Sequence, residues 1–259
     1  MSQTIAGPLL RVEGLSVDFP VRERRVEVVR DVSLAIGRRE LVGLVGESGS
    51  GKSMTALALL RLVPPPGRIA AGRVLLDGED LLVLPETRLR RVRGRRIAMV
   101  FQEPATALNP VYSIGFQIAE AVRAHRPLSR RAALAEAARL LDLVSLPDAR
   151  RRLADYPHQL SGGQRQRVMI AMALAAGPDL LLADEPTTAL DVTVQAQILE
   201  LLERLRQELG LSVLLITHDL AVVAETCERV VVMYCGEVVE EAGVRDLFAR
   251  PAHPYTRAL

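Results

Sequence analysis

The chain has 259 residues, enough for a large core in one or two domains. Its 33 basic and 31 acidic residues give a net charge of +2, so charge alone indicates no nucleic-acid partner. The longest apolar stretch, the nine residues 168–176, is too short to cross a membrane, and residues 1–5 lack signal-peptide features, so we expect a cytosolic protein.

The first predicted elements are strands within residues 9–36. Apolar and polar side chains alternate in part at 15–19 and again at 26–36. Such alternation is typical of strands with one face toward solvent. We therefore expect an antiparallel β part at this end of the chain.

A strand, a glycine-rich loop and a helix are predicted next. Residues 41–45 form a short apolar run, and 54–62 are rich in helix formers and end before three prolines. The loop between them matches the phosphate-binding pattern G-x-x-x-x-G-K-[ST]. Its residues are Gly46, Glu47, Ser48, Gly49, Ser50, Gly51, Lys52 and Ser53.

This loop predicts a nucleotide site. Backbone N–H groups cradle phosphates, and the start of a helix favours negative charge. Lys52 is expected to reach the β- and γ-phosphates, and the Ser53 hydroxyl to bind Mg²⁺. Lys52 is the single lysine among 33 basic residues. A flexible ammonium fits inside a phosphate loop where the planar fork of arginine does not.

Six arginines between 88 and 96 form the densest basic cluster of the chain. A solvated surface segment explains them; the alternative is contact with acidic lipid headgroups or an acidic partner. The six are Arg88, Arg90, Arg91, Arg93, Arg95 and Arg96.

Continuous apolar runs at 97–101, 180–183 and 213–217 predict buried parallel strands near 97–101, 179–183 and 213–217, with a further strand at 229–234. Polar side chains come directly after three of these runs, and the carboxyl ends of parallel strands share one edge of a sheet, where ligands bind. These side chains are Gln102, Asp184, Glu185 and His218.

Each of these side chains has an expected role. Gln102 can orient Mg²⁺ or water, and Asp184 would bind Mg²⁺ directly or through water. Glu185 would hold the attacking water, as a general base or by polarising it. His218 can hydrogen-bond the γ-phosphate.

Residues 103–175 are predicted to form a helical subdomain. Apolar residues recur near helical spacing at 114–124, 129–143 and 161–176, with Pro127 and Pro147 between segments. This insert divides the α/β core into 1–102 and 176–259.

A second predicted anion site begins the helix at 161. Ser161 is a good N-cap, and Gly162 and Gly163 leave backbone N–H groups open, followed by Gln164. Two such sites in one chain make sense if the second faces another subunit. The two cysteines, Cys227 and Cys235, are too few for a metal site and are expected to be buried thiols.

With these motifs in this order, the chain resembles the ATP-binding subunits of ABC transporters over essentially its whole length. Residues 46–53 resemble Walker A, 180–186 Walker B, 160–164 the signature, and 188–191 the D-loop. Gln102 and His218 match the Q-loop and the switch histidine. Phe19 is the candidate for the aromatic side chain that stacks on adenine.

The resemblance implies a fold, two ligands and a dimer. The fold is a P-loop NTPase (RecA-like) core with an antiparallel β subdomain and an inserted α-helical subdomain. The ligands are ATP and Mg²⁺. Two subunits would lie head to tail, with Ser161, Gly162, Gly163 and Gln164 serving the nucleotide held by the partner and Asp191 linking the two sites.

Finer features resemble the oligopeptide, dipeptide and nickel importer group. They are 102–104 with 107–110, then 156–159, 191–197 and 253–256. Such importers pair the ATPase with two membrane-spanning permease subunits, a second ATP-binding subunit (a paralogue or a copy of itself) and an extracytoplasmic solute-binding protein. The resemblance implies a peripheral protein at the cytoplasmic face of the membrane, with no nucleic-acid partner.

Several alternatives stay open at this point. The cargo expected first is a peptide, with nickel or glutathione as alternatives. A soluble ABC ATPase of DNA repair or the ribosome is disfavoured, since the chain has neither a long heptad run nor two such domains. A regulatory module without catalysis and an exporter are the other readings. Family members often continue past 253–256 with a cysteine-rich extension, so we expect either a short member or a truncated chain.

Overall fold

The computed structural model describes residues 7–22 and 24–259. The chain forms two compact units, Met1–Leu89 with Ser212–Leu259 and Arg90–Leu211. Both units are mixed α/β. The expected subdomain boundaries at 103 and 175 fall within the second unit and stay a prediction. Residues 1–5, which entered the signal-peptide argument, lie outside the described residues.

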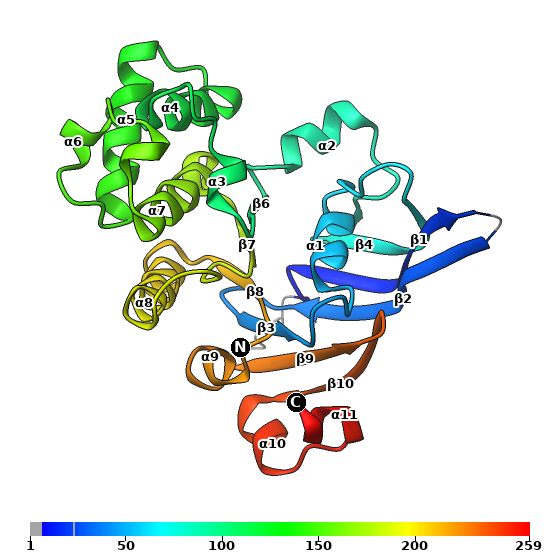
Figure 1. Cartoon of the computed structure of the whole chain (residues 1–259). Coiled ribbons are helices and arrows are strands. Elements are labelled where there is room, and N and C mark those ends of the chain that lie inside the picture. The colour runs from blue at the N-terminus through cyan, green and yellow to red at the C-terminus, as the bar shows by residue number, and fades with distance from the viewer. Residues whose placement is uncertain (1–6, 23) are drawn as a thin grey trace, which may run out of the picture. The chain divides into compact units, whose positions relative to one another are not determined.

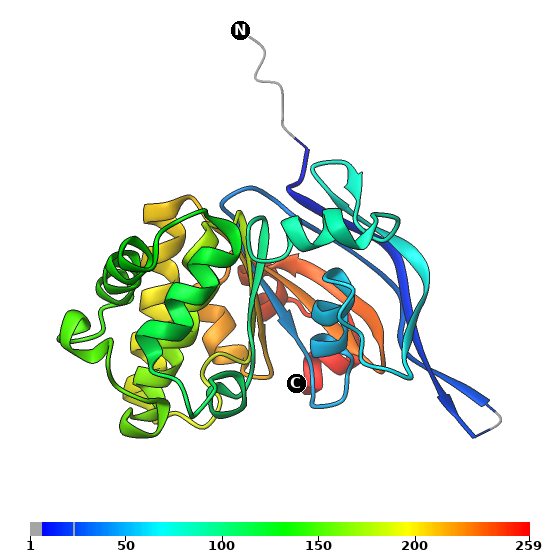
Figure 2. The ribbon, with the colours of Figure 1, turned by 90° about the horizontal axis from the view of Figure 1, so that it is seen from above.

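The first unit contains the expected antiparallel part as a four-stranded sheet in the order β2-β1-β4-β5. Alternate side chains of β1 are buried, among them Leu10, Val12, Leu15 and Val17, so one face of the sheet covers the core. The end of the β1–β2 hairpin extends past β4 (Figure 2). The strands are β1 (Leu10–Val21), β2 (Arg24–Ile36), β4 (Arg68–Leu76) and β5 (Glu79–Asp80).

The same unit contains parallel strands beside the helix that follows the phosphate loop. Strand β3 (Leu41–Val45) pairs in parallel with β8 (Ser212–Thr217) and β9 (Arg229–Tyr234), and β9 pairs antiparallel with β10 (Glu237–Gly243). All residues of β3 and β8 are buried, as their continuous apolar runs predicted. The helices are α1 (Lys52–Leu59), α9 (Leu220–Thr226), α10 (Val244–Ala249) and α11 (Pro254–Ala258) (Figure 1).

The second unit combines a parallel strand pair with a group of helices. Strand β6 (Ile97–Val100) pairs in parallel with β7 (Leu180–Asp184). Helices α4 (Ile114–His125), α5 (Arg130–Leu143) and α7 (Gly162–Ala173) pack on one another. The remaining elements are α2 (Glu86–Val92), which crosses from the first unit, α3 (Pro104–Ala107), α6 (Ala149–Arg152), η1 (Pro157–Gln159), η2 (Leu174–Ala176) and α8 (Val192–Leu209).

Two predicted helices differ from the structure at their ends. The helix expected at 54–62 begins at Lys52, so the last two residues of the phosphate loop form its first turn, and it ends at Leu59 before Arg61 adopts a φ of 51°. The helix expected at 161–176 tightens into a 3₁₀ turn at 174–176, and Gly177 ends it with a φ of 70°.

One cysteine expectation is wrong. Cys227 is buried as expected, but Cys235 is exposed. Cys235 and Gly236 form the two-residue turn between β9 and β10, with φ angles of 48° and 88°. Two positive φ values suit the twist of a tight hairpin. Within this turn the Cys235 side chain faces solvent, whereas Gly236 is buried against Val28.

No helix in the described ranges is long and apolar enough to span a membrane.

Candidate functional site

The phosphate loop is closely packed against neighbouring backbone. Gly46 has a φ of 151°, and a Cβ there would lie 2.1 Å from the carbonyl oxygen of Met233. Gly51 has a φ of 100°, and a Cβ there would lie 2.7 Å from the carbonyl oxygen of Val28. Both positions therefore require glycine, because a side chain would clash and the backbone would be strained. The loop shape is set by β9 and β2 as well as by its own sequence.

Lys52 turns back into this loop. Its side chain is buried, and Nζ donates to the carbonyl oxygens of Gly46 (2.7 Å) and Glu47 (2.8 Å). A longer contact of 3.4 Å joins Nζ to the hydroxyl oxygen of Ser50. The ammonium is thus held inside the curve of the loop, next to the first turn of α1. A phosphate that enters this curve would meet a fixed positive charge and the N–H groups at the start of a helix.

His218 lies at the same end of the first unit's parallel strands as the phosphate loop. Thr217, the last residue of β8, pairs with Val45, the last residue of β3, so His218 and Gly46 both follow directly. The Asp219 carboxylate caps α9 by accepting from the Ala221 N–H at 2.8 Å. The His218 side chain is exposed. The structure therefore brings it to the edge that the sequence predicted.

The second unit places Gln102 beside Glu185. Asp184, at the end of β7, is only 5% exposed, and Glu185 follows with a φ of 44°. Glu185 Oε2 accepts hydrogen bonds from Gln102 Nε2 at 2.9 Å and from the Thr188 hydroxyl at 2.8 Å. Two uncharged donors, an amide and a hydroxyl, therefore contact the same carboxylate oxygen.

The Thr188 contact was not anticipated from the sequence. In the sequence, Thr188 stood out only as the first residue of the segment 188–191 that resembles the D-loop. The chain turns back between the two residues, and the Thr188 N–H donates to the Glu185 carbonyl oxygen at 3.2 Å. A Thr three residues after an acidic residue is a common pattern, so spacing alone could not have found the contact.

The segment 161–164 forms a capped and tightly packed helix start. The Ser161 hydroxyl accepts from the Gln164 N–H at 3.4 Å, and the Gln164 side-chain oxygen accepts from the Ser161 N–H at 3.1 Å. A Cβ on Gly163 would lie 2.5 Å from Val194 Cγ1. Gly163 therefore has a packing role in addition to its predicted role in leaving N–H groups open. Ser161 and Gly162 are exposed.

Asp191 also has a local structural use. Its carboxylate caps α8 by accepting from the Val194 N–H at 2.9 Å. The side chain is exposed, as a residue that contacts another subunit must be before assembly. Its predicted role across an interface stays a prediction.

Phe19, the candidate for adenine stacking, is half-buried on β1. A Cβ on Gly67 would lie 2.3 Å from Phe19 Cζ, so the ring rests on the Gly67 backbone. The neighbouring Asp18 carboxylate pairs with Arg25 and Arg68, both at 2.9 Å. These arginines hold the pKa of Asp18 below its usual value, chiefly through the Arg68 hydrogen bond. The stacking role of Phe19 stays a prediction.

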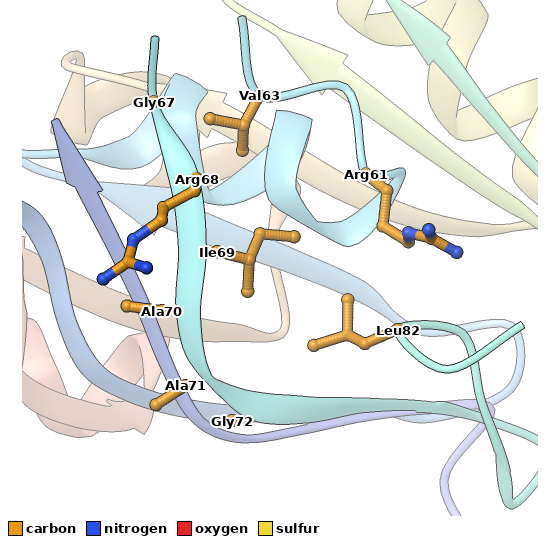
Figure 3. A pocket seen from close by; sticks show the side chains of 9 residues that line it. All are labelled: Arg61, Val63, Gly67, Arg68, Ile69, Ala70, Ala71, Gly72 and Leu82. Atoms are coloured by element: carbon orange, nitrogen blue, oxygen red, sulfur yellow. The ribbon is translucent and has the colours of Figure 1, made fainter. Parts of the chain in front are cut away.

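A pocket of about 440 Å³ lies along β4 and is lined by none of the predicted site residues (Figure 3). Val63, Ile69 and Leu82 contribute apolar side chains to it, and Arg61 and Arg68 contribute cations. Arg68 already pairs with Asp18, and Arg61 donates to the Leu84 carbonyl oxygen at 2.5 Å. Since no residue of 46–53 lines this pocket, it is distinct from the phosphate loop.

Comparison with protein families and curated proteins gives consistent matches. The family profile described as "ABC transporter" matches residues 29–188. A Sinorhizobium fredii protein named as a peptide ABC transporter ATP-binding protein is 55% identical over 252 residues, 97% of this chain and 75% of its own length. A Brucella abortus protein named as a peptide import ATP-binding protein is 54% identical over 258 residues, 97% of this chain and 76% of its own length.

Solved structures match at the level of the fold. The ATP-binding cassette MJ0796, in a post-hydrolysis dimer bound to ADP and phosphate, has a TM-score of 0.81 and 31% identity. The match covers 91% of this chain and 99% of that one. A Clostridium perfringens protein, cbiO1, part of the ABC transporter complex cbiONQ, has a TM-score of 0.79 and 26% identity over 94% of this chain and 92% of its own. These neighbours confirm the predicted fold class.

Proposed function

Because the chain belongs to the ABC transporter family, we propose that it is the ATP-hydrolysing subunit of an importer whose cargo is a peptide. The family assignment establishes an ATPase that binds ATP. The observation that carries the cargo class is the naming of relatives at 54–55% identity as peptide transport ATP-binding proteins. Nickel and glutathione are the alternative cargoes within the same importer group.

We propose that two sets of residues serve the ATP bound by this chain: one holds its phosphates, and the other orients the attacking water. Lys52 and the N–H groups of 46–53 hold the phosphates, and His218 bonds the γ-phosphate. Glu185 orients the attacking water through its carboxylate, which also accepts hydrogen bonds from Gln102 and Thr188. Catalysis of phosphoryl transfer consists mainly of such positioning and charge stabilisation. Phe19 is proposed to stack on the adenine.

The proposed metal is Mg²⁺, with Ser53, Gln102 and Asp184 as the residues that would hold it. A hydroxyl, an amide oxygen and a carboxylate are hard oxygen donors, which suit a small cation that keeps several waters. When bound, the ion would help to neutralise the charge that develops on the transferred phosphate.

A second ATP-binding subunit, either a paralogue or a copy of this chain, is proposed to complete each site. Ser161, Gly162, Gly163 and Gln164 would reach the γ-phosphate held by the partner, and Asp191 would link the two sites. The exposure of Ser161 and Gly162 at the start of α7 supports this proposal. ATP then acts as a ligand shared by two subunits, and its hydrolysis releases them.

The remaining partners are two membrane-spanning permease subunits and, indirectly, an extracytoplasmic solute-binding protein. The subunit would be peripheral, at the cytoplasmic face of the membrane, without a nucleic-acid partner. The net charge of +2 agrees with this expectation, since it gives no strong attraction to nucleic acid.

The first test replaces Glu185 by Gln. The amide keeps the shape and loses the charge, so ATP binding remains while turnover falls by about a hundredfold or more. Steady-state ATPase assays and nucleotide titration measure the two effects. Glu200→Gln, at an exposed carboxylate of α8, is the matched control. Near-normal turnover of Glu185→Gln would remove the role assigned to this residue.

The second test identifies the assembly. The Glu185→Gln variant is used with ATP as bait on native membranes. Recovery of two permease subunits, a paralogous ATPase and a peptide-binding protein is the expected result. A nickel- or glutathione-binding protein in their place would change the cargo. Recovery of ribosomes or DNA-bound complexes would refute the transport assignment and leave the ATPase chemistry intact.

A further inference from the structure

The segment His253-Pro254-Tyr255-Thr256 contacts the phosphate loop, although 208 residues separate the two along the chain. The Glu47 N–H donates a hydrogen bond to the Tyr255 hydroxyl oxygen at 2.8 Å. Both residues belong to the first unit. The sequence marked this segment only as a feature of a subgroup, and the proposed catalytic roles make no use of it.

Local structure explains how Tyr255 comes to be held there. His253 caps α11, with Nδ1 accepting from the Tyr255 N–H at 3.1 Å, and Pro254 is the first helical residue. The Glu240 carboxylate of β10 accepts from the N–H groups of Ala252 (2.8 Å) and His253 (2.9 Å). The start of this short helix is therefore attached to the sheet, and Tyr255 projects from it in one direction.

The aromatic ring adds a second attachment. The Tyr255 ring packs on that of Tyr234, the last residue of β9, with centroids 4.4 Å apart. Two residues later, the Gly236 N–H donates to the Ser50 carbonyl oxygen at 3.0 Å. The turn after β9 thus contacts the phosphate loop at Ser50, and Tyr234 at the end of β9 supports the ring whose hydroxyl contacts the loop at Glu47.

The contact bears on Lys52 through a single peptide bond. The Glu47 N–H and the Gly46 C=O belong to the same planar peptide group. Tyr255 binds the N–H side of this group, and Lys52 Nζ binds its carbonyl oxygen at 2.7 Å. Fixing one side of a rigid plane fixes the direction of the other. The Tyr255 hydrogen bond therefore also orients the Gly46 carbonyl oxygen, which in turn positions the Lys52 ammonium.

We propose that Tyr255 is a positioning residue of the nucleotide site, which holds the Gly46–Glu47 peptide so that Lys52 and the phosphate loop are in place before a nucleotide binds. The inference rests on the proposed role of the loop in binding ATP. Its energetic basis is preorganisation: a loop that is already ordered loses less conformational entropy on binding. Tyr255 acts on the nucleotide only through the loop and touches no reacting atom.

The test is Tyr255→Phe, which keeps the ring and removes the hydroxyl. We expect the Kd for ADP and the KM for ATP to rise about three- to tenfold, as the loss of one hydrogen bond allows, with kcat within about twofold of wild type. The melting temperature without nucleotide should not change. The matched control is Tyr112→Phe, because the Tyr112 ring also packs on an aromatic ring, that of Phe116, at 4.8 Å.

Hydrogen exchange of the nucleotide-free protein provides an independent readout. In Tyr255→Phe, exchange should accelerate in peptides that cover 46–53 and stay unchanged across 237–259. Wild-type affinity for ADP in Tyr255→Phe would overturn the proposal. So would faster exchange confined to 237–259 with a lower melting temperature, since the hydroxyl would then only anchor α11.

The proposed function is tested separately in the same experiment by wild type and Lys52→Ala. If wild type binds no ADP, the nucleotide site itself fails and the inference fails with it. If wild type binds, Lys52→Ala does not, and Tyr255→Phe equals wild type, the inference alone fails.

Discussion

Residue identity in the phosphate loop is set by contacts that leave little choice. Gly46 and Gly51 have backbone conformations that L side chains rarely adopt, and each lies against a backbone carbonyl of another strand. Lys52 has its charge enclosed by carbonyl oxygens of the same loop. Lys52 is the single lysine among 33 basic residues, and the enclosed space at this position fits an ammonium on a flexible stem.

Replacing Lys52 by Ala should weaken nucleotide binding itself. A charge-assisted bond to phosphate is lost, so the Kd for ATP should rise about ten- to hundredfold in calorimetric titration. Lys52→Arg should not restore affinity, because the guanidinium fork is wider than the ammonium. Arg245→Ala, at an exposed arginine of α10, is the control for a lost positive charge. Unchanged affinity in Lys52→Ala would contradict the assignment.

At the scale of elements, Arg229 joins the antiparallel and parallel strands of the first unit. It begins β9, and its Nη2 donates to the carbonyl oxygen of Ala35 on β2 at 2.6 Å. Its Nε donates to the Glu40 carboxylate, just before β3, at 2.9 Å, and Nη1 pairs with Glu241 on β10. Glu40 also accepts from the Gly37 N–H at 2.6 Å. One guanidinium thus connects four strands or their ends.

This cluster predicts a pH-dependent contribution to stability. Burial alone would raise the pKa of Glu40, but the hydrogen bonds from Arg229 and Gly37 lower it below its usual 4.5. A lowered pKa means that the stabilisation is present above pH 4.5 and is lost as pH falls through the folded-state value. We therefore expect Glu40→Gln to cost about 1–2 kcal/mol at pH 7, allowing for partial exposure, and less near pH 3.5.

Urea unfolding at the two pH values measures the Glu40 effect. Glu27→Gln, at an exposed glutamate of β2, is the control. An equal loss at both pH values would mean that the ionised carboxylate is not what stabilises the fold.

At the scale of the whole molecule, each of the two units supplies part of the predicted chemistry. The first contains the phosphate loop and His218, and the second contains Gln102, Asp184, Glu185 and the helix start at Ser161. Ser161 caps α7 and is exposed, so it is available to a second subunit without unfolding of the chain. Because the proposed contact of Ser161 is with the γ-phosphate held by the partner, assembly of the two subunits is expected to depend on ATP.

The assembly prediction concerns Ser161→Arg in the Glu185→Gln background. With ATP, Glu185→Gln should dimerise, and adding Ser161→Arg should prevent dimers while nucleotide still binds. Light scattering after size-exclusion chromatography measures the change.

Ser129→Arg is the matched control, because Ser129 caps α5 in the same way, with its hydroxyl accepting from the Ala132 N–H at 3.2 Å. Both variants lose a cap of about 1 kcal/mol, so a difference between them reports the interface. Dimers that form equally in both would refute the proposed role of Ser161.

Much of the fold was predictable because its signals are local. The continuous apolar runs became β3, β6, β7, β8 and β9, since strands covered on both faces need such runs. The phosphate loop was recognisable because glycines with positive φ must stand at given positions of the chain. The parallel pairing of β6 and β7 places Gln102 and Glu185 at the same edge, as expected. Their hydrogen bond to each other was not expected from the sequence.

By itself, the sequence determined the order of strands, loop and helices, the family, and the residues whose chemistry suits phosphate. These depend on spacing along the chain, which periodicity and motifs record. Only the tertiary structure decided that Tyr255 meets Glu47, that Gly163 makes room for Val194 and that Cys235 faces solvent. Such contacts depend on strand register, turn geometry and the direction of single side chains, which residues far apart in the chain set together.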